Sequence, residues 1–379
     1  MTHRERFNNL FYGKHVDRVP FIDYMGQSNF RSCIPRWKTE GLAADADDAE
    51  VRRIVGFDYI RGYKLNMLSL FYPEFNVEFV RREGDRIYMR NKWGGLEINR
   101  EGSIVMPMTL EGVVKDRDGW ERVRDRLTGG VGSGISVGGD GVAGRFSDDF
   151  DDLCAEAADS DLPVHAGGLP AGFFGGPREI LGLENLIYLF YDDPNLLEEI
   201  LDTLCELWID MCKYIMRRVT LDYYFIWEDM CGKTGPLISP DMFRQFLLPR
   251  YKRWTGALRQ GGCRHISVDS DGDVRELVPL WMEGGVNLIL PWESQFGLDL
   301  RDVRKQYPTL GIIGGLNKRV LEFDRAEMDK ELDKLPYLLE SGYFIPSCDH
   351  GVTNDVPWSN YLYFYDRLRE LIYRHPPNI

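Results

Sequence analysis

The segment HISVDSDGDV, residues 265–274, places Asp269, Asp271 and Asp273 around one glycine, directly after a short apolar run. Carboxylates this close repel one another, so one of them keeps its proton to a higher pH than usual. Such a group can act as a general acid, and a set of carboxylates can also bind a metal ion. The alternative is an ordinary turn. Asp is a favoured N-cap residue, and we expect Asp273 to cap the helical pattern that follows.

Other apolar runs of the chain also end in side chains that can do chemistry. They end in Glu228-Asp229, in Trp292-Glu293, in Asn317-Lys318-Arg319 and in Ser347-Cys348-Asp349-His350. Each of them alone is typical of a turn. Together they predict one site, because the carboxyl ends of parallel strands open onto one face. We expect a catalytic centre made of Glu228, Asp229, Asp269, Asp271 and His350.

Substrate contacts are predicted around this centre. Glu293 and Lys318 supply charged groups, and Gln27 and His165 supply neutral polar ones. Aromatic side chains are expected to wall the substrate, although each one alone is more typical of a core; they are Tyr24, Trp227, Trp292 and Trp358. His165 can also be a core residue, and His265, at the start of its strand, is expected to be structural.

The elements that would position these residues form a regular alternation from residue 162 onward. Short apolar runs at 162–168, 222–229, 264–269, 286–291, 310–315 and 343–346 predict strands. Helical patterns separate them, including 239–262, 274–285, 298–307 and 325–342, and a last amphipathic helix starts at Trp358. This alternation predicts a parallel sheet with helical crossovers. Its even spacing favours a single (β/α)8 TIM barrel of class α/β over an open, doubly wound sheet.

The N-terminal half is less regular. Residues 17–24 predict a first short strand, and residues 77–100 alternate around two glycine turns as a β-hairpin does. Residues 129–145 are rich in glycine and lack the Lys-Ser/Thr ending of a phosphate-binding loop. We interpret residues 1–379 as one barrel domain, with residues 77–147 as an insertion or lid.

Composition excludes several classes of function. A net charge of −14 disfavours nucleic acid and anionic membranes as partners. No apolar stretch is long enough to span a bilayer, and the N-terminus lacks the apolar region of a signal peptide. The seven cysteines form no CxxC pair, which favours free thiols and a cytoplasmic location.

The chain resembles the uroporphyrinogen decarboxylase superfamily in five segments that keep their order. They are RERFNNLFYGKHVDRVPF, SPDMFRQFLLPRYKR, DSDGDVRELVPLWMEGGVNLILPWE, GLDLRDVRKQYPTLGIIGGLNKRVL and GYFIPSCDHGVTNDVPWSNYLYFY. The resemblance covers nearly the whole chain and implies a single (β/α)8 barrel. It also implies one of two activities, that of the true decarboxylases or that of methyltransferases that work with corrinoid proteins.

The arginine-rich loop of the true decarboxylases, similar to RQAGRY after the first strand, is replaced here by DYMGQSNFRS. A polycarboxylate bound without that loop would have desolvated, unpaired charges, which is costly. The methyltransferase branch is therefore the better match.

Thiol-methylating members of that branch carry a zinc pattern of H-x-C-G and a further cysteine near the last strand. This chain has Asp269-Ser270-Asp271-Gly272, and His350 stands where the last cysteine would be, two residues after Cys348. Zinc also accepts oxygen and nitrogen ligands. The resemblance thus leaves a zinc site open, with ligands from Glu228, Asp269, Asp271 and His350, and with Cys348 as a further option.

The resemblance implies the methyltransferase component of a corrinoid-dependent demethylase. Its substrate would be a small methylated compound, a methoxylated aromatic first, with methylamines as a further class. The methyl acceptor would be the cobalt of cobalamin carried by a partner protein, since the chain has no corrinoid-ligating D-x-H-x-x-G motif. The alternatives are a decarboxylase or lyase for a small carboxylic acid, and a non-catalytic ligand-binding barrel. The oligomeric state stays open, a homodimer being one option.

Overall fold

The computed structural model describes residues 1–23, 30–58, 62–65, 70–101, 107–128 and 142–379. Its centre is a seven-stranded sheet in the order β1-β6-β7-β10-β11-β12-β13, in which every pairing is parallel. The strands are β1 (Tyr63–Leu65), β6 (Val164–Gly167), β7 (Tyr223–Trp227), β10 (His265–Asp269), β11 (Leu288–Leu290), β12 (Gly311–Leu316) and β13 (Phe344–Cys348). Six of these strands coincide with the runs predicted from residue 162 onward, so the predicted parallel sheet is confirmed.

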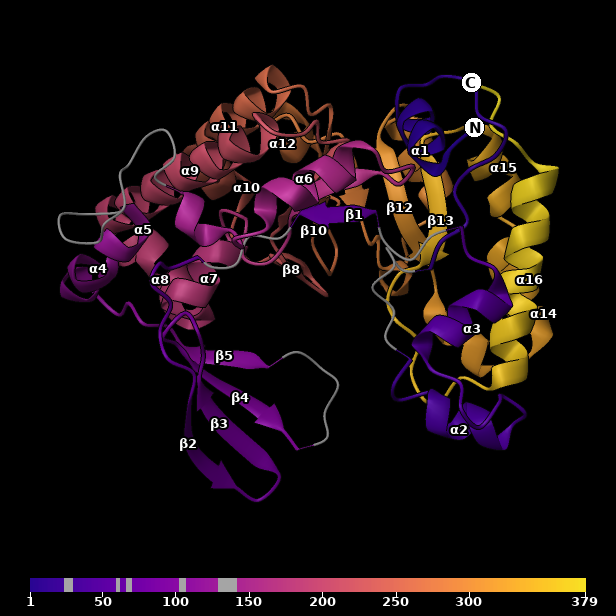
Figure 1. Cartoon of the computed structure of the whole chain (residues 1–379), viewed down its shortest axis with the longest axis horizontal. Coiled ribbons are helices and arrows are strands. Elements are labelled where there is room, and N and C mark those ends of the chain that lie inside the picture. Colours follow the sequence, from indigo (N-terminus) through magenta and orange to yellow (C-terminus); the bar gives the residue numbers. More distant parts are fainter. Residues whose placement is uncertain (24–29, 59–61, 66–69, 102–106, 129–141) are drawn as a thin grey trace.

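The residues of the central strands are buried almost without interruption. All residues of β6, β7, β11, β12 and β13 are buried, which is the pattern of parallel strands covered on both faces. The covering layer consists of amphipathic helices (Figure 1). Those after β6 are α7 (Gly175–Leu181), α8 (Leu183–Asp192) and α9 (Pro194–Met216); those after β7 are α10 (Pro240–Met242) and α11 (Leu248–Gln260), joined by the π-helical turn Phe243–Leu247. Those further on are α12 (Val278–Glu283), α13 (Leu300–Gln306), α14 (Arg325–Leu332), α15 (Leu335–Glu340) and α16 (Trp358–Arg374).

The segment around Phe21 lies between the two edge strands of this sheet. Ile22 lines a small cavity of about 10 Å³ together with Ile345 of β13 and Gly62, which precedes β1. The backbone N–H of Asp58 donates to the carbonyl of Phe21 at 2.8 Å. The predicted first strand is wrong as a strand over its described part, residues 17–23, since no ladder forms there. The segment still lies between β1 and β13, where a closed barrel has its remaining strand. The sheet therefore curls as in a TIM-like barrel.

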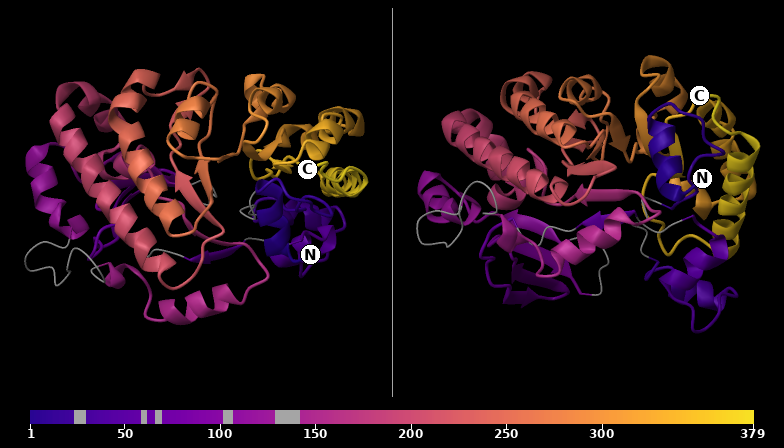
Figure 2. Two further views of the ribbon diagram at one scale, coloured as in Figure 1. Left: turned by 90° about the horizontal axis from the view of Figure 1, so that it is seen from above. Right: turned by 45° about the horizontal axis from the view of Figure 1, so that its top comes forward.

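The N-terminal helices are α1 (His3–Phe11), α2 (Ile34–Thr39), α3 (Asp48–Val55), α4 (Arg117–Val123), α5 (Asp125–Thr128) and α6 (Phe150–Ala158). Of these, α6 contacts β1, α3 contacts α16, and α5 contacts α9. Both chain ends lie at the same end of the molecule, beside β12 and β13 (Figures 1 and 2).

The predicted hairpin is part of a larger antiparallel sheet. Its strands, in the order β2-β3-β4-β5, are β2 (Glu78–Glu83), β3 (Arg86–Arg90), β4 (Leu96–Arg100) and β5 (Met108–Glu111). This sheet projects from the barrel next to α8 (Figure 1). Of the glycine-rich segment 129–145, residues 129–141 fall outside the described residues, and a short 3₁₀ turn follows at Ala143–Arg145.

Among the described residues, no helix combines the length and the hydrophobicity that crossing a bilayer requires. All seven cysteines are buried free thiols.

Candidate active site

Polar side chains follow β7, β10, β11, β12 and β13 at their carboxyl ends. Because these strands are parallel neighbours, the residues after them share one edge of the sheet. Backbone bonds bring the loops close: the N–H groups of Glu228 and Asp229 donate to the carbonyl of Asp269 at 2.9 and 3.3 Å. The predicted juxtaposition of strand ends is therefore present in the fold.

His350 is the centre of the polar cluster. Its Nε2 lies 3.0 Å from Oδ1 of Asp271, and its Nδ1 lies 3.6 Å from Oε1 of Glu293. The imidazole is 24% exposed, so it is in contact with solvent on one side. Burial lowers the pKa of His350, but the hydrogen bond and charge of Asp271 and the charge of Glu293 outweigh burial, so the pKa is raised. The imidazole is thereby kept protonated to a higher pH than usual.

Asp269 lies beside this cluster and has an unusual carboxyl group. Its Oδ1 is buried and has no hydrogen-bond partner within the described residues, although the residue as a whole is partly exposed. Burial raises the pKa of Asp269 well above its usual value, and the charges of Asp271 and Asp229 raise it further. Asp269 therefore favours the protonated form, as the crowding of acids in the sequence predicted.

The turn after Asp271 requires glycine. Gly272 has a φ of +83°, and a Cβ there would meet the backbone of Cys231 at 2.6 Å. The Gly272 N–H donates to Oε2 of Glu293 at 2.6 Å. Glu293 therefore connects the loop of Asp271 with His350.

Asp273 lies outside the cluster and stabilises the turn instead. It accepts a hydrogen bond from the backbone N–H of Arg275 at 3.2 Å and forms an ion pair with the Arg275 guanidinium. The hydrogen bond from the Arg275 side chain lowers the pKa of Asp273. The predicted capping role is wrong for helix α12, whose N-cap position is Leu277 and has no side-chain hydrogen bond; Asp273 stabilises the turn that precedes it.

The prediction that Glu228 belongs to the catalytic and metal-binding set is wrong. The side chain is fully buried, and Oε2 accepts the backbone N–H groups of Phe174 and Gly175 at the start of α7, at 2.6 and 3.0 Å. Oε1 accepts the Phe173 N–H at 2.9 Å and the Tyr251 hydroxyl. Burial raises the pKa of Glu228, and these four donors oppose the shift. Glu228 caps a helix because the first N–H groups of α7 have no partner inside that helix.

Asp229 lies at the edge of the cluster, in a rare backbone conformation with a φ of +51°. Arg178 of α7 holds it there by donating to its carbonyl at 3.0 Å and to Oδ2 at 3.1 Å. The Arg178 guanidinium also lies 4.6 Å from the ring centre of Trp227. Asp229 is thus paired with the Arg178 guanidinium, a cation to which no sequence pattern pointed.

The predicted aromatic wall is largely core. Trp292 is 1% exposed and donates through Nε1 to the Ile289 carbonyl, and Trp227 packs against Gly175 and Arg178. Trp358 packs against Trp37. These three assignments to the substrate wall are wrong, because the side chains are buried against other residues of the fold.

The remaining predicted contacts have mixed outcomes. His165 is buried and stacks on Tyr223 with 4.5 Å between ring centres, as its core alternative predicted. His265 is buried against Phe7 and Phe11, and burial lowers the pKa of His265 to about 4. Lys318 lies near the cluster, but its ammonium donates to the Gly351 carbonyl at 3.2 Å. Tyr24 and Gln27 lie outside the described residues.

The predicted zinc ligands do not assemble. No group of three or more His, Cys, Asp or Glu side chains in the described part of the chain is arranged to hold a metal ion. The Cys348 thiol is buried, receives a hydrogen bond from Tyr365, and has its pKa raised to about 12 by burial. Since Glu228 also points into the core, this side-chain arrangement does not fit a structural or catalytic zinc ion.

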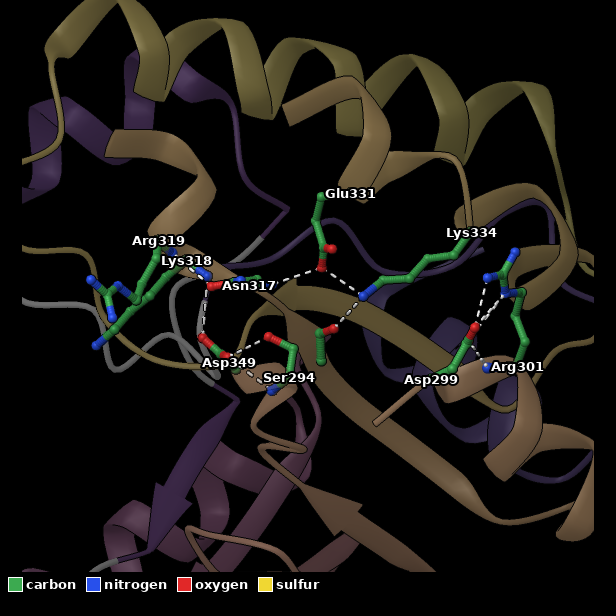
Figure 3. A network of polar contacts seen from close by, with 10 residues as sticks. Ser294, Asp299, Arg301, Asn317, Lys318, Arg319, Glu331, Lys334 and Asp349 are labelled. Carbon is green, nitrogen blue, oxygen red and sulfur yellow. Dashed lines mark hydrogen bonds and ion pairs between the residues drawn. The ribbon is translucent and has the colours of Figure 1, made fainter. Parts of the chain in front are cut away.

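Sequence reasoning also missed Asp349, which is buried and accepts hydrogen bonds from Ser294 and Lys318 (Figure 3). A signal was available, since Asp349 directly follows a buried strand and precedes His350.

Comparison with known proteins gives a family and a fold. The profile of the family described as Uroporphyrinogen decarboxylase (URO-D) matches residues 172–371, more than half of the chain. A solved structure of a methyltransferase from Methanosarcina mazei superimposes with a TM-score of 0.57 and 14% sequence identity. The match covers 97% of this chain and 99% of that one. No curated protein sequence matches the chain.

Proposed function

Because the chain belongs to the uroporphyrinogen decarboxylase family, we propose that it is a methyltransferase of the corrinoid-linked type. It takes a methyl group from a small methylated compound, a methoxylated aromatic first, and passes it to the cobalt of cobalamin on a partner protein. The observation that carries the proposal is the position of His350 between Asp271 and Glu293, next to Asp269. The Methanosarcina mazei protein of similar fold, itself named a methyltransferase, adds support.

The difficult part of such a reaction is the leaving group. The reduced cobalt of the acceptor is the nucleophile, so this chain has no nucleophile to supply. When the bond between the methyl carbon and the ether oxygen breaks, its electron pair goes to the oxygen, which becomes a good leaving group only if it receives a proton. His350 and Asp269 both hold a proton to higher pH than usual, and either one can deliver it. The demethylated alcohol or phenol then leaves.

The charge of the site disfavours the alternative substrate, a small carboxylic acid. A decarboxylase would need cations directed at the substrate, and the cations that the sequence offers for this role are Lys318, Arg319 and Arg31. The Lys318 ammonium is bonded to the Gly351 carbonyl, and Arg178 is bonded to Asp229. The groups around His350 are carboxyls, which repel an anionic substrate and accept a neutral or cationic one.

The test is direct methyl transfer. Purified protein is mixed with a reduced corrinoid protein and a panel of methoxyarenes and methylamines, and cobalt methylation is followed by absorbance. We expect methylation with at least one methoxyarene. His350→Gln should slow it by about 10²–10⁴-fold, whereas Asp273→Ala, a change in the same region but outside the cluster, should not. Absence of methylation over the whole panel, or release of carbon dioxide from a small acid without any corrinoid protein, would overturn the proposal.

A further inference from the structure

Asp349 is a buried carboxylate directly beside the proposed acid. The residue is 4% exposed, yet both of its oxygens have partners from other loops (Figure 3). Oδ2 accepts the backbone N–H and the hydroxyl of Ser294, which follows β11, at 3.2 and 3.0 Å. Oδ1 accepts the backbone N–H of Lys318, which follows β12, at 3.3 Å. The side chain directly after β13 therefore connects the loops that follow β11 and β12.

The loop after β12 is itself held from the outside. Glu331 of α14 accepts the Asn317 N–H at 2.8 Å and pairs with Lys334 at 2.6 Å. The Lys334 ammonium also donates to the Gly315 carbonyl at 2.9 Å (Figure 3). Both side chains of this pair are less than one-fifth exposed. The bonds of Glu331 and Lys334 thus hold the backbone on the N-terminal side of Lys318, whose N–H donates to Asp349.

The partners of Asp349 are neutral donors. Within the described residues, no Lys or Arg side chain forms an ion pair with it, since its bonds come from two backbone N–H groups and one hydroxyl. A buried carboxylate held only by neutral donors keeps most of its negative field. Its neighbour in the chain, His350, lies within that field, because Asp349 is among the charges that favour the protonated imidazole.

We propose that Asp349 is a positioning residue for His350. By tying the loops after β11 and β12 to the end of β13, it fixes where His350 leaves the sheet and keeps the imidazole between Asp271 and Glu293. The titratable groups that face the imidazole are Asp269 and Asp271 after β10, Glu293 after β11 and Asp349 itself, while the Lys318 ammonium after β12 is bonded to the Gly351 carbonyl. The importance of this role for catalysis rests on the proposed function, whereas the positioning itself does not.

The experiment is a titration of His350 by nuclear magnetic resonance in the full-length protein, which contains six histidines. His350→Gln identifies its signals. We expect Asp349→Asn to move the titration midpoint of His350 to lower pH and to weaken the signature of its hydrogen bond to Asp271. Asp299→Asn is the matched control, since it makes the same chemical change to a nearby carboxylate that is already paired with Arg301 at 2.6 Å. It should leave the titration of His350 unchanged.

Two results would overturn the proposal: an unchanged midpoint in Asp349→Asn, or an equal shift in Asp299→Asn. If Asp349→Asn does not fold, Asp349→Glu serves as the test variant. It keeps the charge but displaces the oxygens by one methylene, so the Asp271–His350 hydrogen bond should weaken while the midpoint stays near that of the wild type. An undisturbed hydrogen bond in this variant would contradict positioning.

Activity adds a second readout. If methyl transfer occurs, its alkaline limit should move to lower pH in Asp349→Asn and stay in place in Asp299→Asn. If methyl transfer fails in the wild type while the titration behaves as expected, the proposed function is wrong and the positioning role stands.

Discussion

The carboxylates after β7 and those after β10 are similar in sequence and opposite in role. Glu228 is surrounded by four hydrogen-bond donors from the start of α7 and from Tyr251, and it has no contact with solvent. Asp271 and His350, by contrast, have one another as partners and are 45% and 24% exposed. The number of hydrogen-bond donors decides the difference. Glu228 accepts four hydrogen bonds and is a structural cap, whereas Asp271 has the His350 imidazole as its side-chain partner, is partly exposed and remains available for chemistry.

The largest effect on stability should come from replacing Glu228, the structural cap. In Glu228→Ala the N–H groups of Phe173, Phe174 and Gly175 lose their acceptor inside the protein. Each buried unsatisfied donor costs about 1–3 kcal/mol, so we expect a loss of about 5 kcal/mol in the free energy of unfolding. Urea denaturation measures it. Tyr251→Phe, which removes only one of the four bonds, should cost about 1 kcal/mol. A loss below 1 kcal/mol in Glu228→Ala would show that the cap contributes little.

For His350, in the candidate active site, we expect the opposite result: a large loss of activity and a small loss of stability. His350→Gln should lower the rate of methyl transfer by about 10²–10⁴-fold, the usual contribution of a general acid, with little loss of stability near pH 8. Because the pKa of His350 is raised, wild-type activity should persist above the ordinary pKa of histidine and fall as the pH passes through the folded-state pKa. A rate profile measured from pH 5 to about pH 9 tests both points. A His350→Gln enzyme with wild-type rates would exclude the imidazole as the acid.

Asp269 allows the comparison to be tested by stability measurements, because its Oδ1 is buried but lacks the hydrogen-bond donors that Glu228 has. Its raised pKa means that the folded protein keeps a proton that the unfolded chain loses above about pH 4. The free energy of unfolding therefore decreases as the pH rises from that value toward the folded-state pKa. Asn at this position does not ionise.

We thus expect Asp269→Asn to be more stable than the wild type near neutral pH, by a margin that grows with pH across this window. Urea denaturation at about pH 5 and about pH 8 measures the margin. A margin that is constant or shrinks with pH would contradict a protonated Asp269.

The fold could be predicted from the sequence because its signals are local. The apolar runs after residue 162 and the patterns between them fix six strands of the sheet, and parallel pairing then brings Asp271 and His350 to one edge. The first strand could not be predicted reliably. Its few apolar residues are also satisfied by packing between the edge strands without a ladder, as Ile22 is.

The location of the site could be predicted from the sequence, but the role of each residue in it could not. Glu228 and Asp229 are neighbours whose side chains go to different layers, and the sequence does not say which one faces the helices. The glycines of the segment AGFFGGP were a usable signal. A Cβ at Gly172 would lie 2.2 Å from the Trp227 carbonyl and one at Gly175 would lie 2.4 Å from it, so this turn wraps closely around the end of β7 and directs its N–H groups at Glu228.

The smallest effect should come from Asp273, which is within the same acidic turn as Asp271 but belongs to neither side of the comparison. Its oxygens bind the N–H and guanidinium of Arg275, so Asp273→Ala removes a turn-stabilising contact at the surface. We expect a loss of about 1 kcal/mol in the free energy of unfolding, typical of a lost side-chain hydrogen bond. Methyl transfer and the His350 titration should stay as in the wild type, because within the described residues the Asp273 side chain bonds to Arg275 and not to His350, Glu293 or Asp269. A rate loss comparable with that of His350→Gln would mean that all three aspartates of the turn act together. The number of hydrogen-bond donors around an acid would then not distinguish structural from functional acids.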